Sequence, residues 1–400
     1  MELTERFLTY VAYPTASDEE SETIPSTARQ KALAEHLAKE LAGLGLENAF
    51  ADEYGRVYAY LPASGGTGEP IGFIAHMDTS PAAPGENIRP RLVSYTGGDI
   101  DLGNGVVTRA KDFEKLPLYA GKTLIVTDGT TLLGADDKAG VAEIVTAVEY
   151  LVRHPEIKHR GVAVAFTPDE EVGRGVERFD LDAFKAKQAY TVDGGTLGEI
   201  EYECFNAAAA KVTVRGVNIH PGSAKNKMKN AALMAAEFIA RMPAAETPAH
   251  TEKYEGFYHL CEMRGDESGA VLKWIVRDHD RAAFEARKRF MQNLTDYMNG
   301  VYGGCFTIEI KDSYYNMREL IEQGHMDLVE NAKAAMQKAD VTPQIVAIRG
   351  GTDGAMLTYR GLPCPNLSVG GENFHGVHEF ACVEDMEKMV EVLVELAKAE

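Results

Sequence analysis

The segment Ile71-Gly72-Phe73-Ile74-Ala75-His76-Met77-Asp78 decides the expected fold, because a short apolar run ends there at a histidine and an aspartate. The run has the length and composition of a buried β-strand. Three more apolar runs are followed by acidic clusters, at residues 134–138, 169–171 and 192–195. In open α/β sheets the carboxyl ends of parallel strands line one crevice, so residues placed there converge. The sequence therefore predicts a metal pocket of carboxylates and imidazoles at this edge.

Alternating β and α patterns extend outward from this segment. Apolar runs at 161–167 and 366–369 alternate with helical stretches, which indicates an α/β fold with a largely parallel mixed sheet flanked by helices. Residues 81–129 are rich in glycine and proline, and we interpret them as an extended hairpin insertion.

From residue 207 the order changes to β-α-β-β-α-β, which predicts a small separate domain. The α/β rhythm resumes near Met317. We therefore expect a catalytic domain formed by residues 1–206 and 316–400, with an inserted lid or dimerisation domain at 207–315.

The composition is that of an ordinary soluble globular protein, with 45% hydrophobic and 26% charged residues in 400. A net charge of −20 disfavours nucleic acid and anionic membranes as partners. The start of the chain lacks the pattern of a secretory signal, so we expect a cytoplasmic protein. Its five scattered cysteines fit reduced thiols better than disulfides.

Candidate ligands stand at these strand ends, and each has an ordinary structural alternative. His76 and Asp78 lie on the same side of an extended chain, so the carboxylate can orient a metal-binding imidazole, or both can simply end a strand. Glu170 and Glu171 can point to different places from one turn, but paired glutamates also occur on solvated loops. Asp136 opens a helix and can bind a metal or cap the helix.

The remaining ligand types come from two further places. Asp193 precedes two glycines that permit close approach, and the segment His375-Gly376-Val377-His378-Glu379 carries two histidines. Spacing alone does not separate His375 from His378. Five such clusters in one chain are improbable as independent accidents, so together they favour a metal site.

The motifs that contain these residues resemble the peptidase T family of tripeptide aminopeptidases. That family belongs to the di-zinc exopeptidases, which include peptidase V and carboxypeptidase G. The resemblance covers nearly the whole chain, and Gly97-Gly98-Asp99-Ile100 is typical of peptidase T rather than of the larger group. The other matching motifs lie at residues 74–80, 132–140, 168–173, 220–225 and 373–380.

The resemblance implies two zinc ions that share one carboxylate ligand. Asp136 is the implied bridging ligand. The other implied ligands are His76 and Asp193 on one zinc ion, and Glu171 and His378 on the other.

The resemblance also assigns catalytic roles beside these ligands. Glu170 is implied as the general base, Asp78 as the residue that orients His76, and the peptide from Asp136 to Asp137 as cis. Two zinc ions are balanced by three ligand carboxylates and one bridging hydroxide. Such a pair supplies hydroxide at neutral pH and stabilises the oxyanion. Mn²⁺ or Co²⁺ could replace zinc at such ligands.

Residues outside the metal set are expected to contact the substrate. His220 is implied to stabilise the oxyanion, and in relatives of this kind the residue can enter from the other subunit of a dimer; a histidine in a surface loop is the simpler interpretation. Arg277 and Arg349 are candidates to bind the terminal carboxylate of the peptide, since arginine suits bidentate recognition; either could be a structural ion pair. Asn373 is a further substrate-binding candidate.

The leading hypothesis is therefore a cytoplasmic, homodimeric, zinc-dependent aminopeptidase that releases the N-terminal residue from tripeptides. Its expected partner is a small peptide substrate, without nucleic acid or membrane. One alternative is a dipeptidase or an N-acyl-amino-acid deacylase on the same frame. Another is a catalytically silent metal-binding or peptide-binding homologue, against which the intact Glu170 argues. In a third, the inserted domain serves mainly as a dimer scaffold.

Overall fold

The computed structural model describes residues 1–398 and divides the chain into two compact units. The first unit comprises Met1–Tyr202, Glu319–Val346 and Thr352–Glu400, and the second comprises Glu203–Arg318 and Ala347–Gly351. The observed divisions lie within a few residues of the expected ones at 206 and 315. One assignment differs: residues 347–351, expected in the catalytic domain, belong to the inserted unit.

The first unit is built on an eight-stranded mixed sheet with the order β1-β2-β8-β3-β9-β16-β10-β15. Its central strands β8, β3, β9 and β16 are parallel, whereas β1, β2 and β10 pair antiparallel to their neighbours. This confirms the expected α/β class. The strands are β1 (Glu47–Ala51), β2 (Val57–Leu61), β3 (Ile71–His76), β8 (Val162–Thr167), β9 (Ala189–Gly194), β10 (Glu199–Glu203), β15 (Gln344–Ala347) and β16 (Asn366–Ser368).

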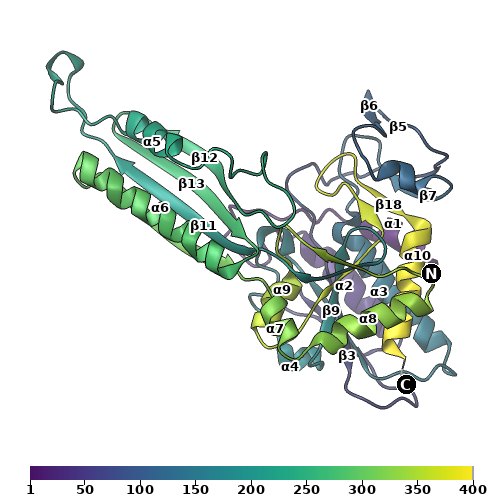
Figure 1. Ribbon diagram of the computed structural model, residues 1–400. Coiled ribbons are helices and arrows are strands. Elements are labelled where there is room, and N and C mark those ends of the chain that lie inside the picture. The colour runs from purple at the N-terminus through teal and green to yellow at the C-terminus, as the bar shows by residue number, and fades with distance from the viewer. Residues whose placement is uncertain (399–400) are drawn as a thin grey trace. The chain divides into compact units, whose positions relative to one another are not determined.

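Helices cover both faces of this sheet, as the ribbon shows around β3 and β9 (Figure 1). On one face α3 packs against β3 and β9, with α1 and α10 beside it. From the other face, Ile74 of β3 packs with Phe184 of α4 and Leu357 of α9. The helices are α1 (Leu3–Val11), α2 (Gln30–Gly43), α3 (Ala135–Arg153), α4 (Leu181–Phe184), α7 (Arg318–Glu322), α8 (Met326–Lys338), α9 (Asp353–Tyr359) and α10 (Val383–Ala397).

Because helices cover both faces of the sheet, the central strands β3 and β8 are apolar up to their last residue. Every residue of β3 and of β8 is buried. A strand buried on both faces has a continuous apolar run instead of an alternating pattern. The side chains that can carry chemistry are therefore confined to the strand ends, where the sheet meets the loops.

The glycine-rich region is not one extended hairpin. Only β5 (Ile100–Gly103) and β6 (Val106–Thr108) form a local hairpin. The flanking strands β4 (Arg91–Ser94) and β7 (Thr123–Val126) instead enter a four-stranded sheet with β17 (Gly371–Glu372) and β18 (Phe380–Cys382). This sheet anchors the region around residue 375 to strands from the middle of the chain.

The second unit has the predicted β-α-β-β-α-β order. Its sheet order is β12-β13-β11-β14, and its helices pack against this sheet (Figure 1). Alternate residues of β11, including Ala208 and Val212, pack with Phe238 of α5 and Met291 of α6. The elements are β11 (Asn206–Arg215), α5 (Ala231–Ala240), β12 (Phe257–Gly265), β13 (Gly269–Asp278), α6 (Arg281–Tyr302) and β14 (Phe306–Tyr314).

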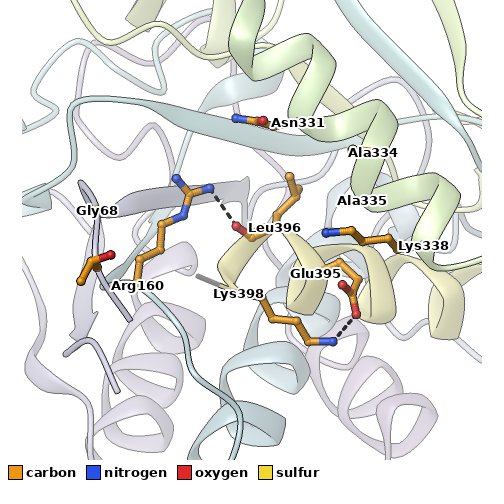
Figure 2. A pocket seen from close by; sticks show the side chains of 10 residues that line it. Gly68, Arg160, Asn331, Ala334, Ala335, Lys338, Glu395, Leu396 and Lys398 are labelled. Carbon is orange, nitrogen blue, oxygen red and sulfur yellow. Dashed lines mark hydrogen bonds and ion pairs between the residues drawn. The ribbon is translucent and has the colours of Figure 1, made fainter. Parts of the chain in front are cut away.

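A cavity of about 410 Å³ lies at the amino-terminal edge of the main sheet, between α8 and the end of α10 (Figure 2). Arg160, just before β8, donates to the carbonyl oxygen of Leu396 at 2.8 Å, and Lys398 pairs with Glu395. These charged groups hold the end of α10, and the predicted metal ligands stand at the opposite end of the strands. No helix within residues 1–398 is long and apolar enough to cross a membrane.

Glu143 in the middle of α3 predicts a measurable effect on stability. Its carboxyl group is fully buried, and neither oxygen has a hydrogen-bond partner. Burial, reinforced by the nearby Asp385, raises the pKa of Glu143 well above 4.5. Unfolding releases its proton at pH values between 4.5 and the folded pKa, so this group lowers stability progressively as pH rises through that window. We therefore expect Glu143→Met to stabilise the protein at pH 8 by about 1 kcal/mol or more, with a smaller gain at pH 5.

Urea unfolding of both proteins at the two pH values measures this difference. Glu149→Met on the same helix is the matched control, because Glu149 pairs with the buried Arg6. That substitution should destabilise the protein, since it removes one of the two carboxylates that pair with the buried Arg6 and leaves Glu40 as the other. A Glu143→Met protein less stable than the wild type at pH 8 would contradict the prediction.

Candidate metal centre

His76 stands at the carboxyl end of β3 and is almost completely buried. Its Nδ1 lies 3.0 Å from the carbonyl oxygen of Asp78 and 3.3 Å from that residue's carboxylate. Both acceptors favour a proton on Nδ1, which leaves Nε2 as the free donor atom for a metal. Nε2 lies 2.8 Å from Asp136 Oδ1 and 3.4 Å from Asp193 Oδ1.

Asp136 lies between two imidazoles. Its Oδ1 faces His76, and its Oδ2 lies 3.0 Å from Nε2 of His375. The peptide from Asp136 to Asp137 is cis, as the resemblance implies. Asp137 is turned to the backbone, where it accepts hydrogen bonds from the N–H groups of His76 and Gly140. The two oxygens of Asp136 thus face different imidazoles, as a bridging carboxylate requires.

The two glutamates after β8 begin a 3-10 turn, Glu170–Val172, at this same edge. The carboxylate of Asp78 accepts hydrogen bonds from the backbone N–H groups of Glu170 at 3.0 Å and Glu171 at 3.2 Å. Glu171 directs Oε2 to within 3.0 Å of His375 Nε2, while its Oε1 is buried without a partner. Asp78 therefore couples the position of His76 to that of the adjacent glutamates.

The carboxylates of this cluster lie close together in a buried site, so burial and the repulsion between their negative charges oppose ionisation. Burial raises the pKa of Asp193 to about 7 and raises the pKa of Glu170 well above its ordinary value. Burial also opposes ionisation of Asp136, but hydrogen bonds from His375 and His76 outweigh it and hold the pKa of that carboxyl well below its usual range.

This donor set fits a pair of divalent cations. Ligand atoms of His76, Asp136 and Glu171 lie within 4.8 Å of one another, as do those of His76, Asp137 and Asp193. Imidazole nitrogens with carboxylate oxygens are ordinary zinc ligands. The buried Glu171 Oε1 without a partner is an acceptor that such an ion would satisfy.

Besides His76, the histidine that reaches the carboxylates is His375, and not His378 as expected. His378 Nδ1 lies 2.9 Å from the hydroxyl of Thr108, and its ring packs against Phe113 at 4.8 Å. His375 adopts a left-handed conformation with φ of 64°, and its ring is 49% exposed. The backbone turn, which residue spacing does not reveal, therefore decides which ring reaches the carboxylates.

Asn373 braces this turn. It has a φ of 59°, and its Nδ2 donates to the carbonyl oxygen of His378 at 3.2 Å. In the structure this predicted substrate-binding residue therefore holds the loop that carries His375.

The other predicted substrate contacts lie in the second unit. His220 begins an exposed turn, and its Nδ1 accepts a hydrogen bond from Gly222 N. Arg277 lies on β13, donates to the carbonyl oxygens of Ala208 and Val276, and packs over the Tyr314 ring.

Arg349 holds a loop of the second unit. Its guanidinium donates to the carbonyl oxygens of Lys253 at 2.7 Å and Glu255 at 2.9 Å, and to the hydroxyl of Thr251 at 2.9 Å. It also lies over the ring of Phe205 at 5.1 Å. The terminal nitrogens of Arg349 are thus engaged within its own unit.

Two buried carboxylates of the predicted clusters, Asp169 and Glu379, had no role assigned to them from the sequence. Asp169, at φ of 59°, accepts hydrogen bonds from the N–H and hydroxyl of Ser26 and from Gln30 Nε2, at 2.5–2.7 Å. Glu379 accepts three backbone N–H groups from the loop that carries Asp136. Their positions in the sequence could have indicated a role. Asp169 directly precedes Glu170 in the loop after β8, and Glu379 directly follows His378 just before β18.

Comparison with known proteins identifies the family. The model for peptidase family M20/M25/M40 matches residues 126–399. Peptidase T of Caldanaerobacter subterraneus subsp. tengcongensis is 52% identical over 399 residues, which cover 98% of this chain and 97% of the relative.

Solved structures agree with this match. Aminopeptidase PepT from Bacillus cereus ATCC 10987 superposes with a TM-score of 0.76 at 27% identity, over 99% of this chain and 97% of that one. A dinuclear metal-binding peptidase of the M20 family from Bacillus subtilis has a TM-score of 0.66 at 13% identity, covering 99% and 96% of the two chains. The second likeness bears on the fold alone.

Proposed function

Because this chain belongs to peptidase family M20/M25/M40, we propose that it is a zinc-dependent aminopeptidase that releases the N-terminal residue from tripeptides. The observation that carries the proposal is the placement of Asp136 between the imidazoles of His76 and His375, with the other carboxylates around them. The 52% identity to a peptidase T over nearly the full length supports the substrate class.

The proposed ligand set replaces His378 with His375. Asp136 is the shared ligand, His76 and Asp193 complete one position, and Glu171 and His375 complete the other. When bound, two zinc ions polarise the scissile carbonyl group and lower the pKa of water in the site. Mn²⁺ or Co²⁺ remain possible occupants of such ligands.

Glu170 is the proposed general base. No hydrogen bond from an imidazole of the cluster to its carboxylate is found among residues 1–398, which leaves that group free to accept a proton from water. Burial keeps the pKa of Glu170 high, and neighbouring cations would lower it toward neutral pH, where a base works best. The carboxyl group would then donate the proton to the departing amine. Asp78 fixes the backbone from which Glu170 projects.

Residues of the inserted unit have proposed roles in binding the peptide. We propose a cytoplasmic homodimer in which the exposed His220 would stabilise the oxyanion, from its own subunit or from the partner. Arg277 would bind the terminal carboxylate of the peptide. The engagement of Arg349 with its own loop makes it the weaker candidate for that task. These assignments rest on the family resemblance and on the chemistry of the side chains.

Hydrolysis of an unblocked tripeptide, compared with the matching dipeptide, tetrapeptide and N-acetyl tripeptide, tests the proposal. We expect selective cleavage of the tripeptide that is lost on chelation and restored by zinc. Preference for the dipeptide or for the acetylated substrate would reassign the enzyme as a dipeptidase or a deacylase. A zinc-loaded protein that cleaves none of them would be a silent homologue.

A further inference from the structure

We propose that Glu379 is a positioning residue that fixes Asp136 relative to His375. The inference rests on the proposed function, because it concerns two of the proposed metal ligands. These ligands come from segments 239 residues apart in the chain, so their separation is not set by local backbone geometry. Something must hold the two segments together at the site.

The carboxylate of Glu379 makes that connection directly. Its Oε2 accepts hydrogen bonds from the backbone N–H groups of Leu133 at 2.7 Å and Gly134 at 2.9 Å, and its Oε1 accepts one from Asp136 at 3.1 Å. Only 2% of Glu379 is exposed. Leu133 and Gly134 directly precede α3 and Asp136 lies in its non-helical first turn, so the carboxylate stands at the amino-terminal end of the helix, which favours a negative charge. The contact therefore acts on the backbone of Asp136 itself.

The other end of the connection is equally fixed. Glu379 stands four residues after His375, and its own N–H donates to the carbonyl oxygen of Gly376 at 3.2 Å, which closes the turn. The next residue, Phe380, begins β18 and pairs with Val126 of β7. The backbone of Glu379 is thus held between this turn and β18, while its side chain contacts the 133–136 loop.

The three contacts need a carboxylate specifically. A glutamine at this position has one oxygen and one NH₂ group. One end of its amide would present a donor to a backbone donor, so at least one buried N–H would lose its partner. Aspartate keeps both oxygens but is one methylene shorter, and it would draw the loop toward β18. Both changes should shift Asp136 against His375 without removing a metal ligand.

The test compares the full-length wild-type protein with Glu379→Gln and Glu379→Asp. Each is equilibrated at a series of buffered free Zn²⁺ concentrations, and bound zinc per chain is measured by elemental analysis, together with Tm and tripeptide turnover. Glu384→Gln is the matched control, because Glu384 also accepts a backbone N–H, from Thr123, but touches no ligand loop.

We expect the wild type and Glu384→Gln to bind two zinc ions with the same affinity. Glu379→Gln should bind zinc at least about tenfold more weakly and lose a comparable factor in kcat, the usual cost of removing a group that orients a ligand. Glu379→Asp should fall between, and it supplies the result if Glu379→Gln does not fold.

Wild-type zinc affinity in both folded Glu379 variants, with only a lower Tm, would show a purely structural role and overturn the proposal. The same result in Glu379→Asp alone would overturn it if Glu379→Gln does not fold. A wild-type protein that binds no zinc would instead overturn the proposed function, and with it this inference. Zinc binding by the wild type alone reveals that failure, so failure of the proposed function can be distinguished from failure of this inference.

Discussion

Glu170→Ala is expected to reduce tripeptide hydrolysis by about 10³-fold or more, within or near the range that a positioned general base contributes, while zinc content stays nearly normal. The reason is that the two glutamates in the turn after β8 have different contacts. Glu171 faces His375 at 3.0 Å, whereas no hydrogen bond or ion pair of the Glu170 carboxylate with either imidazole is found within residues 1–398. Removing Glu170 should therefore remove a proton acceptor without removing a ligand.

The adjacent Glu171→Ala is the matched control for this experiment. It changes the same turn by the same number of atoms, but it should lower bound zinc and activity together. The measurements are elemental analysis of the dialysed proteins and steady-state hydrolysis of one unblocked tripeptide. Unchanged turnover in Glu170→Ala would remove this residue from the mechanism, and loss of zinc would make it a ligand instead.

Much of the fold follows from the sequence because strand burial leaves a strong pattern. The six residues of β3 are all buried, so they read as one apolar run that stops at His76. The same holds for β8 and the glutamates that follow it. The rule that parallel strands end at one edge then predicts that these residue types meet. The inserted unit is also predictable, because its helices and strands follow each other locally.

Long-range pairing explains what could not be predicted. The hairpin expected at 81–129 is divided because β7 pairs with β18, more than 250 residues later, and no local signal encodes that partner. Arg349 belongs to the second unit through its contacts with residues 251–255. Glu379 is four residues after a histidine in the sequence, but its role appears only when the 133–136 loop lies beside it.

The two histidines of the C-terminal motif provide the sharpest test of the site. His375→Ala is expected to lose one of two zinc ions and to reduce hydrolysis to near background, because the His375 ring lies 3.0 Å from both Asp136 and Glu171. His378→Ala should retain both ions, since its ring contacts Thr108 and Phe113 instead. Some loss of stability or turnover is expected there, because the ring fills space beside the loop.

Bound zinc per chain, measured after dialysis against the same buffered metal, separates the two variants without reference to activity. A chain that keeps two ions in His375→Ala and loses one in His378→Ala would return the ligand to His378. It would also mean that the turn rearranges when metal binds, because His378 is engaged with Thr108 in this structure. The spacing of the motif allows either ring, so the left-handed backbone at Asn373 and His375 is what makes His375 the expected ligand.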